Sequence, residues 1–376
     1  MATPTSVDQV RHRRGALAHA MKPSVWRSTL AVDMSRTGFA VPFRVGIAVG
    51  LVLVVGGLTG QRDVAGFAAL GALISAFCRP DPYRVRTGRL AVLGVATVAS
   101  VGVGASIGLA DAPLTVEIAV IALLGGAAAL LVGALHITGP GAVVFVFAAN
   151  GAVSFAHTTG DLTRAMVAAA IGALVGAAAS LAPWIAEGVR SRLRPAASPD
   201  PAVSAPTVRY ESIRTTLTRR PGNDLLANSF RIVAGIAASA AIATAIGLSH
   251  PMWAAMGAMA AMQGVRYHVT VQRGLQRLIG NIAGGVIAAI LLGIGLGYWQ
   301  AVIAIVACQI VAEIMAPANY AIASTAVTPM ALLLTALSAG LTPDAALDRV
   351  ADTLIGIVVG IVIAAVTITR QDRFTA

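Results

Sequence analysis

The sequence predicts an all-α membrane protein with about twelve transmembrane helices, arranged as two six-helix repeats that point the same way. Composition is the first observation: 57% of the 376 residues are hydrophobic and 11% are charged, and the mean hydropathy is +0.81. A soluble domain carries roughly 25% charged residues, so this chain has too little polar surface to face water. The apolar stretches are long and continuous, and the two halves share landmarks in the same order.

The continuity of the apolar stretches decides between helices and a β-barrel. Runs such as 91–110 and 118–135 contain no regular polar alternation. A transmembrane strand shows alternating polarity over about 10 residues, whereas a spanning helix needs about 20 apolar residues. Because the backbone in lipid must satisfy its own hydrogen bonds, these runs predict helices.

Polar, proline and glycine breaks divide the chain into candidate spans. In the first half these are 43–60, 64–78, 88–109, 115–135, 140–157 and 163–185. In the second half they are 230–248, 251–265, 278–296, 299–315, 320–340 and 350–368. The second span of each set is short for a full crossing, so we expect a tilted or broken helix there.

The remaining regions complete the organisation: a basic N-terminal arm at 1–42, the first repeat at 43–186, a linker at 187–229, the second repeat at 230–369 and a tail at 370–376. The arm lacks the apolar core and cleavage site of a signal peptide. It is either an amphipathic helix on anionic lipid or a disordered tail. The proline-rich linker is shorter than a typical domain of at least about 50 residues.

Arginine distribution predicts the orientation. The net charge is +11, and with a cytoplasmic N-terminus the loops predicted to be inside carry Arg79, Arg84, Arg86, Arg89, Arg266, Arg273 and Arg277. The loops predicted to be outside carry mainly acids, namely Asp63, Asp111, Glu117, Asp161, Asp344 and Asp348. Basic loops face the cytoplasm, so both termini are expected there. The arginines form no nucleic-acid-binding motif, and no nucleic-acid partner is expected.

An internal repeat follows from aligning the two halves. At one offset Phe43-Arg44 aligns with Phe230-Arg231, Asp63 with His250, Arg79 with Arg266 and Arg86 with Arg273. The glycine pairs Gly172/Gly176 and Gly356/Gly360 follow similar Leu-x-Arg segments and predict close helix approach. A unit with an even number of crossings repeats in parallel, and a cavity is expected between the two copies.

Three segments of the second half resemble the fusaric acid resistance (FUSC) family of aromatic acid exporters. They are Ser249-His-Pro-Met-Trp253 followed by Arg277-Leu-Ile-Gly280, Glu313 followed by Asn319-Tyr320 and Thr328-Pro329, and Arg349 to Gly356 with Asp352-Thr353. The resemblance covers residues 228 to 368 well and the first half weakly, since Asp63-Val-Ala-Gly66 replaces the His-Pro-x-Trp turn there.

The resemblance implies a secondary transporter that exports small organic anions or aromatic acids across the bacterial inner membrane, with protons as the candidate driving ion. Plant aluminium-activated malate channels are similar at the level of a six-helix unit, so a passive anion channel is an alternative. A scaffold that recruits cell-envelope proteins through its arm and linker is a second alternative. Expected partners are the lipid bilayer and a small organic anion.

Six residues are candidates for the substrate or proton pathway: Glu313, Arg44, Arg231, Asn319, Thr328 and Pro329. Glu313 is the acid placed well inside a predicted span, and it either exchanges protons or pairs with a loop arginine. Arg44 and Arg231 either bind a carboxylate as a symmetric pair or anchor their helices at the interface. Asn319, Thr328 and Pro329 surround a predicted helix break whose freed backbone groups could line a site.

Other polar residues have structural interpretations. Arg349 and Asp352 are close enough in sequence to pair within one turn, and Trp253 is predicted at the outer interface, where Trp commonly anchors. Cys78 and Cys308 are far apart and form no disulfide or metal motif. The chain has no Walker loop and a single lysine, Lys22, so no enzyme activity, metal or cofactor is expected.

Overall fold

The computed structural model describes residues 29–193, 212–263, 267–340 and 342–367. Across these ranges the chain forms helices and loops without a strand, as expected from the sequence. The first half contains α3 (Ala40–Leu58), α4 (Ala65–Ala72) continued by the 3₁₀ helix η2 (Leu73–Ala76), α5 (Tyr83–Leu109), α6 (Leu114–Ala134), α7 (Val143–Phe155) and α8 (Thr159–Leu193). The second half contains α10 (Asn223–Ala245), α11 (Pro251–Met262), α12 (Tyr267–Gly293), α13 (Tyr298–Met315), α14 (Tyr320–Ala339) and α15 (Asp344–Val366).

The flanking regions are described only in part. The predicted arm is described from residue 29 and contains η1 (Met34–Arg36) and the start of α3, and the linker region contains α9 (Ile213–Thr218). Helix α8 extends into the predicted linker and α10 begins before the predicted second repeat. Arg266 and the tail at 370–376 lie outside the described residues.

Membrane-spanning helices dominate the fold. By length and composition, nine helices of the described chain can cross a bilayer, so the protein is a multi-pass membrane protein. The segments Ala65–Ala76 and Val143–Phe155 are shorter apolar helices. Helix α11 is also short and apolar, with 12 residues. The predicted ranges at all three places contain a helix, but its length falls short of the roughly 20 residues of a full crossing.

Burial explains how the short helices are accommodated. Every residue from Met252 to Met262 of α11 is buried, and so is almost all of α4 and η2. A helix enclosed by other helices can end inside the bundle, because its neighbours cover its ends. The loop before α7 contains Gly139 and Gly141 at φ +149° and +89°, conformations that favour glycine and delay the helix start.

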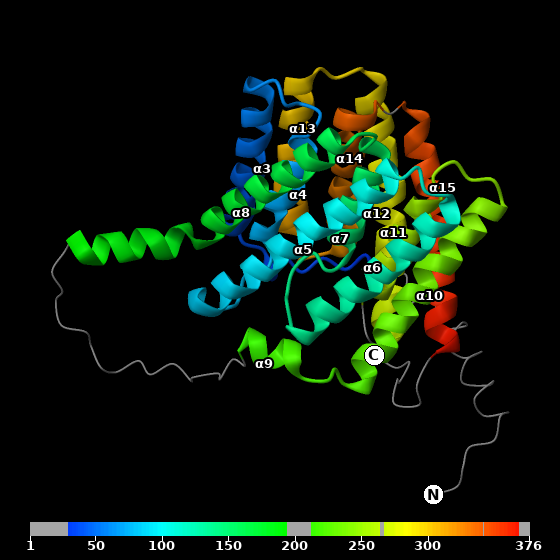
Figure 1. The fold of residues 1–376 in the computed structure, drawn as a ribbon, viewed down its shortest axis with the longest axis horizontal. Coiled ribbons are helices and arrows are strands. Elements are labelled where there is room, and N and C mark those ends of the chain that lie inside the picture. Colours follow the sequence, from blue (N-terminus) through cyan, green and yellow to red (C-terminus); the bar gives the residue numbers. More distant parts are fainter. Residues whose placement is uncertain (1–28, 194–211, 264–266, 341, 368–376) are drawn as a thin grey trace, which may run out of the picture.

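Equivalent helix pairs pack in the two halves (Figure 1). Helix α4 packs on α8 as α11 packs on α15. Helix α5 packs on α7 and α8, and α12 packs on α14 and α15. Between the halves, α3 of the first half packs on α13 of the second, while α10 of the second packs on α6 of the first. The two halves are therefore joined mainly by two helix pairs, α3 with α13 and α6 with α10.

Glycines allow the closest of these contacts. A Cβ added to Gly172 of α8 would collide with the carbonyl oxygen of Ala68 in α4. A Cβ added to Gly356 of α15 would collide in the same way with the carbonyl oxygen of Ala254 in α11. The close approach predicted for the glycine pairs is confirmed at both places.

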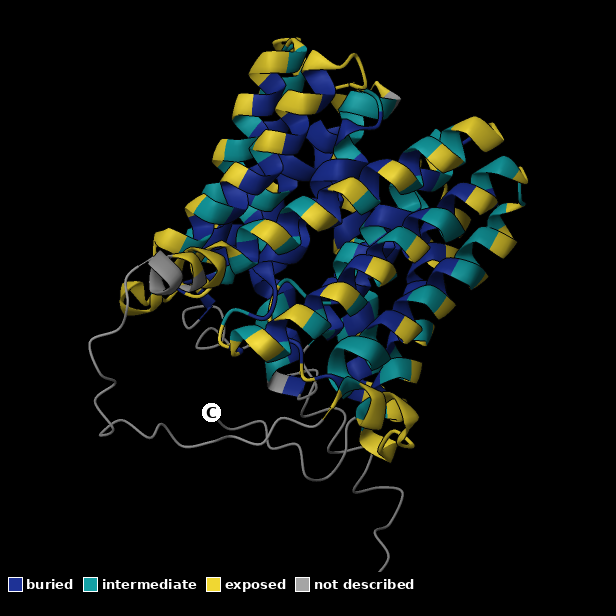
Figure 2. Ribbon diagram, turned by 60° about the vertical axis from the view of Figure 1, so that its left-hand side comes forward, coloured by how far each residue is buried: buried dark blue, intermediate teal, exposed yellow. Residues whose placement is uncertain are grey.

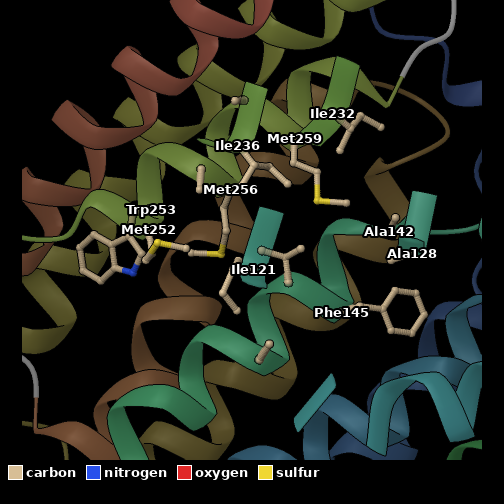
Figure 3. Packing of buried hydrophobic residues seen from close by; sticks show 14 of the residues in the cluster. Ile121, Ala128, Ala142, Phe145, Ile232, Ile236, Met252, Trp253, Met256 and Met259 are labelled. Carbon is tan, nitrogen blue, oxygen red and sulfur yellow. The ribbon is translucent and has the colours of Figure 1, made fainter. Parts of the chain in front are cut away.

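The outer faces are apolar and exposed, whereas the interior is packed (Figure 2). Large apolar side chains that face outward include Ile47, Leu51, Leu58, Leu174, Val286, Ile290, Ile303 and Val358. Such a surface requires lipid as its solvent. Figure 3 shows the packed interior between the halves, where Met256 and Met259 of α11 and Ile236 of α10 lie beside Ile121 of α6.

The two ends of the bundle differ in charge. One end, where α5, α10, α12 and α14 begin, contains Arg36, Arg79, Arg84, Arg89 and Arg273, and we call it the arginine-rich end; it is the lower end in Figure 1. The opposite end, where α4, α11 and α15 begin, contains Asp63, Asp161 and Asp348. This polarity supports the charge pattern predicted from the loops.

Candidate functional site: a cavity between the two halves

A cavity of about 540 Å³ lies between the two halves. Its walls come from α4, η2 and α7 of the first half and from α11 to α15 of the second. Its polar lining consists of Arg36, Arg79, Thr138, Arg273, Arg277, Gln309, Glu313, Tyr320 and Arg349. Five arginines thus face one glutamate, and the cavity has a strongly positive lining.

The cavity extends inward from the arginine-rich end. Arg36 and Pro317 lie at this end, and Arg349 lies deep within the bundle. Leu70 and Phe147 line the cavity and also a much smaller pocket that continues to Leu334 and Ser338. Leu70 and Phe147 therefore lie where the cavity and the smaller pocket adjoin.

Glu313 of α13 is held by an ion pair. Its Oε2 pairs with Nη2 of Arg79, and its Oε1 accepts a hydrogen bond of 2.9 Å from Nε2 of Gln309. Arg79 also donates from Nε to the carbonyl oxygen of Ala76, at 3.1 Å. Of the two alternatives for Glu313, the structure contains the pairing with a loop arginine. This ion pair joins the first half to the second beside the cavity.

Arg277 of α12 and Arg349 of α15 bring positive charge deep into the cavity. Their exposed fractions are 7% and 3%, and the Nε of each has no hydrogen-bond partner. Within the described ranges, neither forms an ion pair with an acid. The guanidinium of Arg349 lies over the ring of Trp253, 5.2 Å from its centroid. Two buried cations with no acid within ion-pair distance are costly, which is typical of a site that binds an anion.

The six candidate site residues did not include Arg277 and Arg349, because the sequence placed both as loop arginines. The predicted span began at residue 278, but α12 begins at Tyr267 and carries Arg277 well inside the bundle. The helical spacing of Arg273 and Arg277, four residues apart and both lining the cavity, is a signal that could have placed them on one face.

Asp352 does not pair with Arg349, contrary to the expectation from their spacing. Asp352 is fully buried, and neither of its carboxylate oxygens has a hydrogen-bond partner among the described residues. Spacing along a helix brings two side chains near each other without fixing their directions. Here the Arg349 side chain contacts Trp253 and lines the cavity instead.

Trp253 is also placed differently from the prediction. It is 4% exposed, so it does not anchor the helix at the lipid interface. Its ring stacks on His250 with centroids 4.1 Å apart, and His250 Nδ1 lies 3.2 Å from Asp348 Oδ2. Figure 3 shows Trp253 beside Met252 in the packed interior. The expectation was wrong because α10 and α15 pack against α11 and cover this face.

Asn319 forms the N-cap of α14 and also makes hydrogen bonds to the backbone of the N-terminal arm. Its Oδ1 accepts hydrogen bonds from the backbone N–H of Ala321 and Ile322, at 2.7 and 3.4 Å. Its Nδ2 donates to the carbonyl oxygens of Thr29 and Ala31, at 3.1 and 2.8 Å. The segment next to η1 is therefore fastened to the second half at the arginine-rich end.

Thr328 connects three helices beside Pro329, which lies inside α14. The Thr328 hydroxyl donates to Asn281 Oδ1 at 3.1 Å, and Asn281 Nδ2 donates to the carbonyl oxygen of Arg349 at 3.0 Å. This chain of bonds positions α12, α14 and α15 behind the Arg349 backbone. Neither Thr328 nor Pro329 is among the residues that line the cavity.

Arg44 and Arg231 are not brought together. Arg44 lies on α3, which packs on α13, and Arg231 lies on α10, which packs on α6. Both are partly buried, and neither is among the lining residues of the cavity.

The geometry defines a multi-pass membrane protein with a positively lined cavity between two helical halves. Residues 236–363 match the family model described as fusaric acid resistance protein-like, so the second half carries a domain of this kind. The match runs from α10 to α15 and includes Arg277, Glu313, Arg349 and Asp352. No curated protein and no solved structure matches the chain significantly.

Proposed function

We propose that this protein is a secondary transporter that exports small organic anions or aromatic acids across the bacterial inner membrane. The observation that carries the proposal is the pair Arg277 and Arg349, two buried cations that line one cavity without an acid partner among the described residues. A carboxylate in the cavity would supply the missing partner. Guanidinium and carboxylate groups form paired, charge-assisted hydrogen bonds that suit this role.

The remaining lining suits the apolar body of such an acid. Phe147, Met256 and Met330 form apolar walls, and Tyr320 adds an aromatic ring. A volume of about 540 Å³ lies in the usual range of small-molecule pockets. Small aromatic and aliphatic carboxylates are therefore the substrate class that fits.

We infer that transport uses two parallel six-helix repeats, with α4–η2, α7 and α11 counted as crossings. The equivalent packing of α4 on α8 and α11 on α15, and the reciprocal contacts between halves, support this repeat. Alternating access then arises when one half rocks against the other around the cavity. The arginine-rich end is cytoplasmic in this proposal, by the positive-inside rule.

Glu313 and Arg79 act in this proposal as a tie between the halves at the cytoplasmic mouth. The ion pair must break or slide when the halves rock, because one partner belongs to each half. Arg44 and Arg231 anchor their helices at the membrane interface, and Asn319, Thr328 and Pro329 position α14 beside the site.

Anion flux into liposomes tests the proposal. Purified protein is reconstituted, and uptake of benzoate and of aliphatic carboxylates is followed with and without a pH gradient. Saturable flux that Arg277→Gln and Arg349→Gln abolish supports a transporter. The matched control is Arg84→Gln, since Arg84 is exposed at the arginine-rich end and does not line the cavity. Flux without saturation would indicate a channel, and no flux by folded protein would favour a scaffold.

A further inference from the structure

Asp352 is the buried acid that the proposed function leaves unused. It lies one turn from Arg349 on α15, with an exposed fraction of 0%. Its two carboxylate oxygens lack hydrogen-bond donors within the described part of the chain. An ionised carboxylate there would lose its hydration without compensation, so burial favours the neutral acid.

The titratable groups on α15 and on the three helices packed against it define the charges around Asp352. On α15 itself, Asp348 lies one turn before Asp352 and disfavours a second negative charge, while Arg349 favours it. His250, the N-cap of α11, pairs with Asp348, and Arg277 of α12 lies close enough to Arg349 to interact with its charge. Helix α10 has its titratable residues, Asp224 and Arg231, near the arginine-rich end, away from Asp352. Asp352 therefore has one like and one opposite charge within one turn of α15 and no hydrogen-bond donor among the described residues.

We propose that Asp352 is the proton-binding site of this transporter and controls whether Arg349 binds an anion. When Asp352 is a neutral acid, Arg349 is an uncompensated cation and attracts the substrate carboxylate. When Asp352 ionises, its charge compensates Arg349 from the neighbouring turn and the substrate is released. This inference rests on the proposed function, because it requires an anion in the cavity.

Proton and anion therefore bind together. The proton comes from water and adds to a carboxylate oxygen of Asp352, and it returns to water when the substrate leaves. Asp348 and His250, whose side chains are each 37% exposed, lie between Asp352 and the opposite end and provide the nearest groups for proton exchange. One proton moved with one monocarboxylate gives a cycle without net charge, so the outward concentration gradient of the acid, and not the proton gradient, drives export in this scheme.

Calorimetric titration of purified protein with benzoate tests the linkage. Titrations in Bis-Tris and in Tris at one pH give the number of protons taken up, since the two cationic buffers differ in ionisation enthalpy. We expect uptake of up to one proton per benzoate, and a Kd that rises by up to about tenfold per pH unit between pH 6 and 8. Asp352→Asn should bind benzoate without proton uptake and without this pH dependence.

Two further variants distinguish a proton-binding role of Asp352 from a general loss of folding or of benzoate binding. Asp344→Asn should take up protons as the unmodified protein does, because Asp344 is exposed at the start of α15 and does not line the cavity. Asp348→Asn should retain the uptake but move the pH dependence to lower pH, because it removes the like charge that disfavours ionisation of Asp352. This second variant keeps the test decisive if Asp352→Asn fails to fold.

The outcomes distinguish this inference from the proposed function. Benzoate binding without proton uptake, or uptake that survives in Asp352→Asn, overturns the proton site and leaves the anion transporter standing. An unchanged pH dependence in Asp348→Asn would equally count against it. If folded protein binds no carboxylate at any pH, both the linkage and the proposed substrate site are rejected.

Discussion

Arginine residues occur in two distinct environments in this protein. Arg84 and similar side chains lie exposed at the arginine-rich end, where they cost little and determine orientation. Arg277 and Arg349 have the same chemistry but are buried against the cavity. At the scale of the single residue, burial without an ion-paired acid among the described residues distinguishes Arg277 and Arg349 from the surface arginines.

Replacement of Arg349 by lysine should separate charge from geometry. Lysine retains the positive charge but cannot donate two parallel hydrogen bonds to a carboxylate. Loss of a hydrogen bond to a charged group costs about 1.5–3 kcal/mol, so we expect benzoate affinity to fall roughly 10- to 100-fold in Arg349→Lys. Titration calorimetry measures this, with Arg84→Lys as control. Equal affinities in both variants would contradict a bidentate contact.

The thiol of Cys78 should resist alkylation. Burial is the main cause that raises the pKa of the Cys78 thiol to about 12, and the negative charge of Asp81 is the second. At pH 7.5 almost none of the thiol is therefore in the reactive thiolate form. We expect N-ethylmaleimide to leave Cys78 unmodified in folded protein and to label it after denaturation in SDS. Mass spectrometry of the labelled peptides gives the result.

An exposed cysteine provides the control for this experiment. Thr218→Cys places a thiol on the exposed end of α9 and should be labelled at pH 7.5. The sign of the pH dependence follows from the raised pKa: labelling of Cys78 increases only as the pH approaches 12. Labelling of both sites at similar rates in folded protein would show that Cys78 is accessible and ionises normally.

At the scale of the helix, length and burial act together. The long helices have apolar outer faces and cross the bilayer, while α4, α7 and α11 are short. The apolar runs between polar, proline and glycine residues predicted a helix at each of these places. It could not predict that the short helices would be enclosed, because enclosure depends on which distant helix packs against them.

Substitution of Gly356 tests the helix contact between α15 and α11. In Gly356→Ala the new Cβ meets the backbone of Ala254, which cannot move away as a flexible side chain could. We expect a loss of about 1–3 kcal/mol of stability, seen as a lower Tm in detergent. Gly222→Ala is the matched control, since no atom lies within 4 Å of its added Cβ. Equal Tm values would mean that this approach is looser than described.

At the scale of the whole molecule, the described residues of the two halves meet through helix contacts and through one ion pair beside the cavity. The contacts of α3 with α13 and of α10 with α6 are apolar and broad. The pair between Arg79 and Glu313 is local and sensitive to charge. A transporter that rocks its halves needs such contacts to be specific and also reversible.

Charge exchange tests the ion pair between the halves. Arg79→Glu and Glu313→Arg should each lower benzoate flux, because each places two like charges together at a partly buried site. The double variant restores the attraction with the partners exchanged, and we expect it to recover most of the flux. Flux per folded molecule, after correction for the amount reconstituted, is the measurement. A double variant no better than either single one would show that the residues act separately.

The sequence by itself determined the membrane class, the helical fold and the approximate positions of the apolar helices α3 to α8 and α10 to α15, but not of η1 or α9. These follow from composition and from the length of apolar runs, which are local properties of the chain. It also revealed the fusaric acid resistance protein-like segment, because its motifs occur in order along the chain.

Only the tertiary structure decided which polar residues matter for the cavity. Glu313 acquired a partner from the other half, and Asp352 lost the partner that its spacing suggested. Arg277 and Arg349 became a pair only when α12 and α15 packed side by side. The physical reason is that the cost of a buried charge depends on what surrounds it in space, and those neighbours come from helices far apart in sequence.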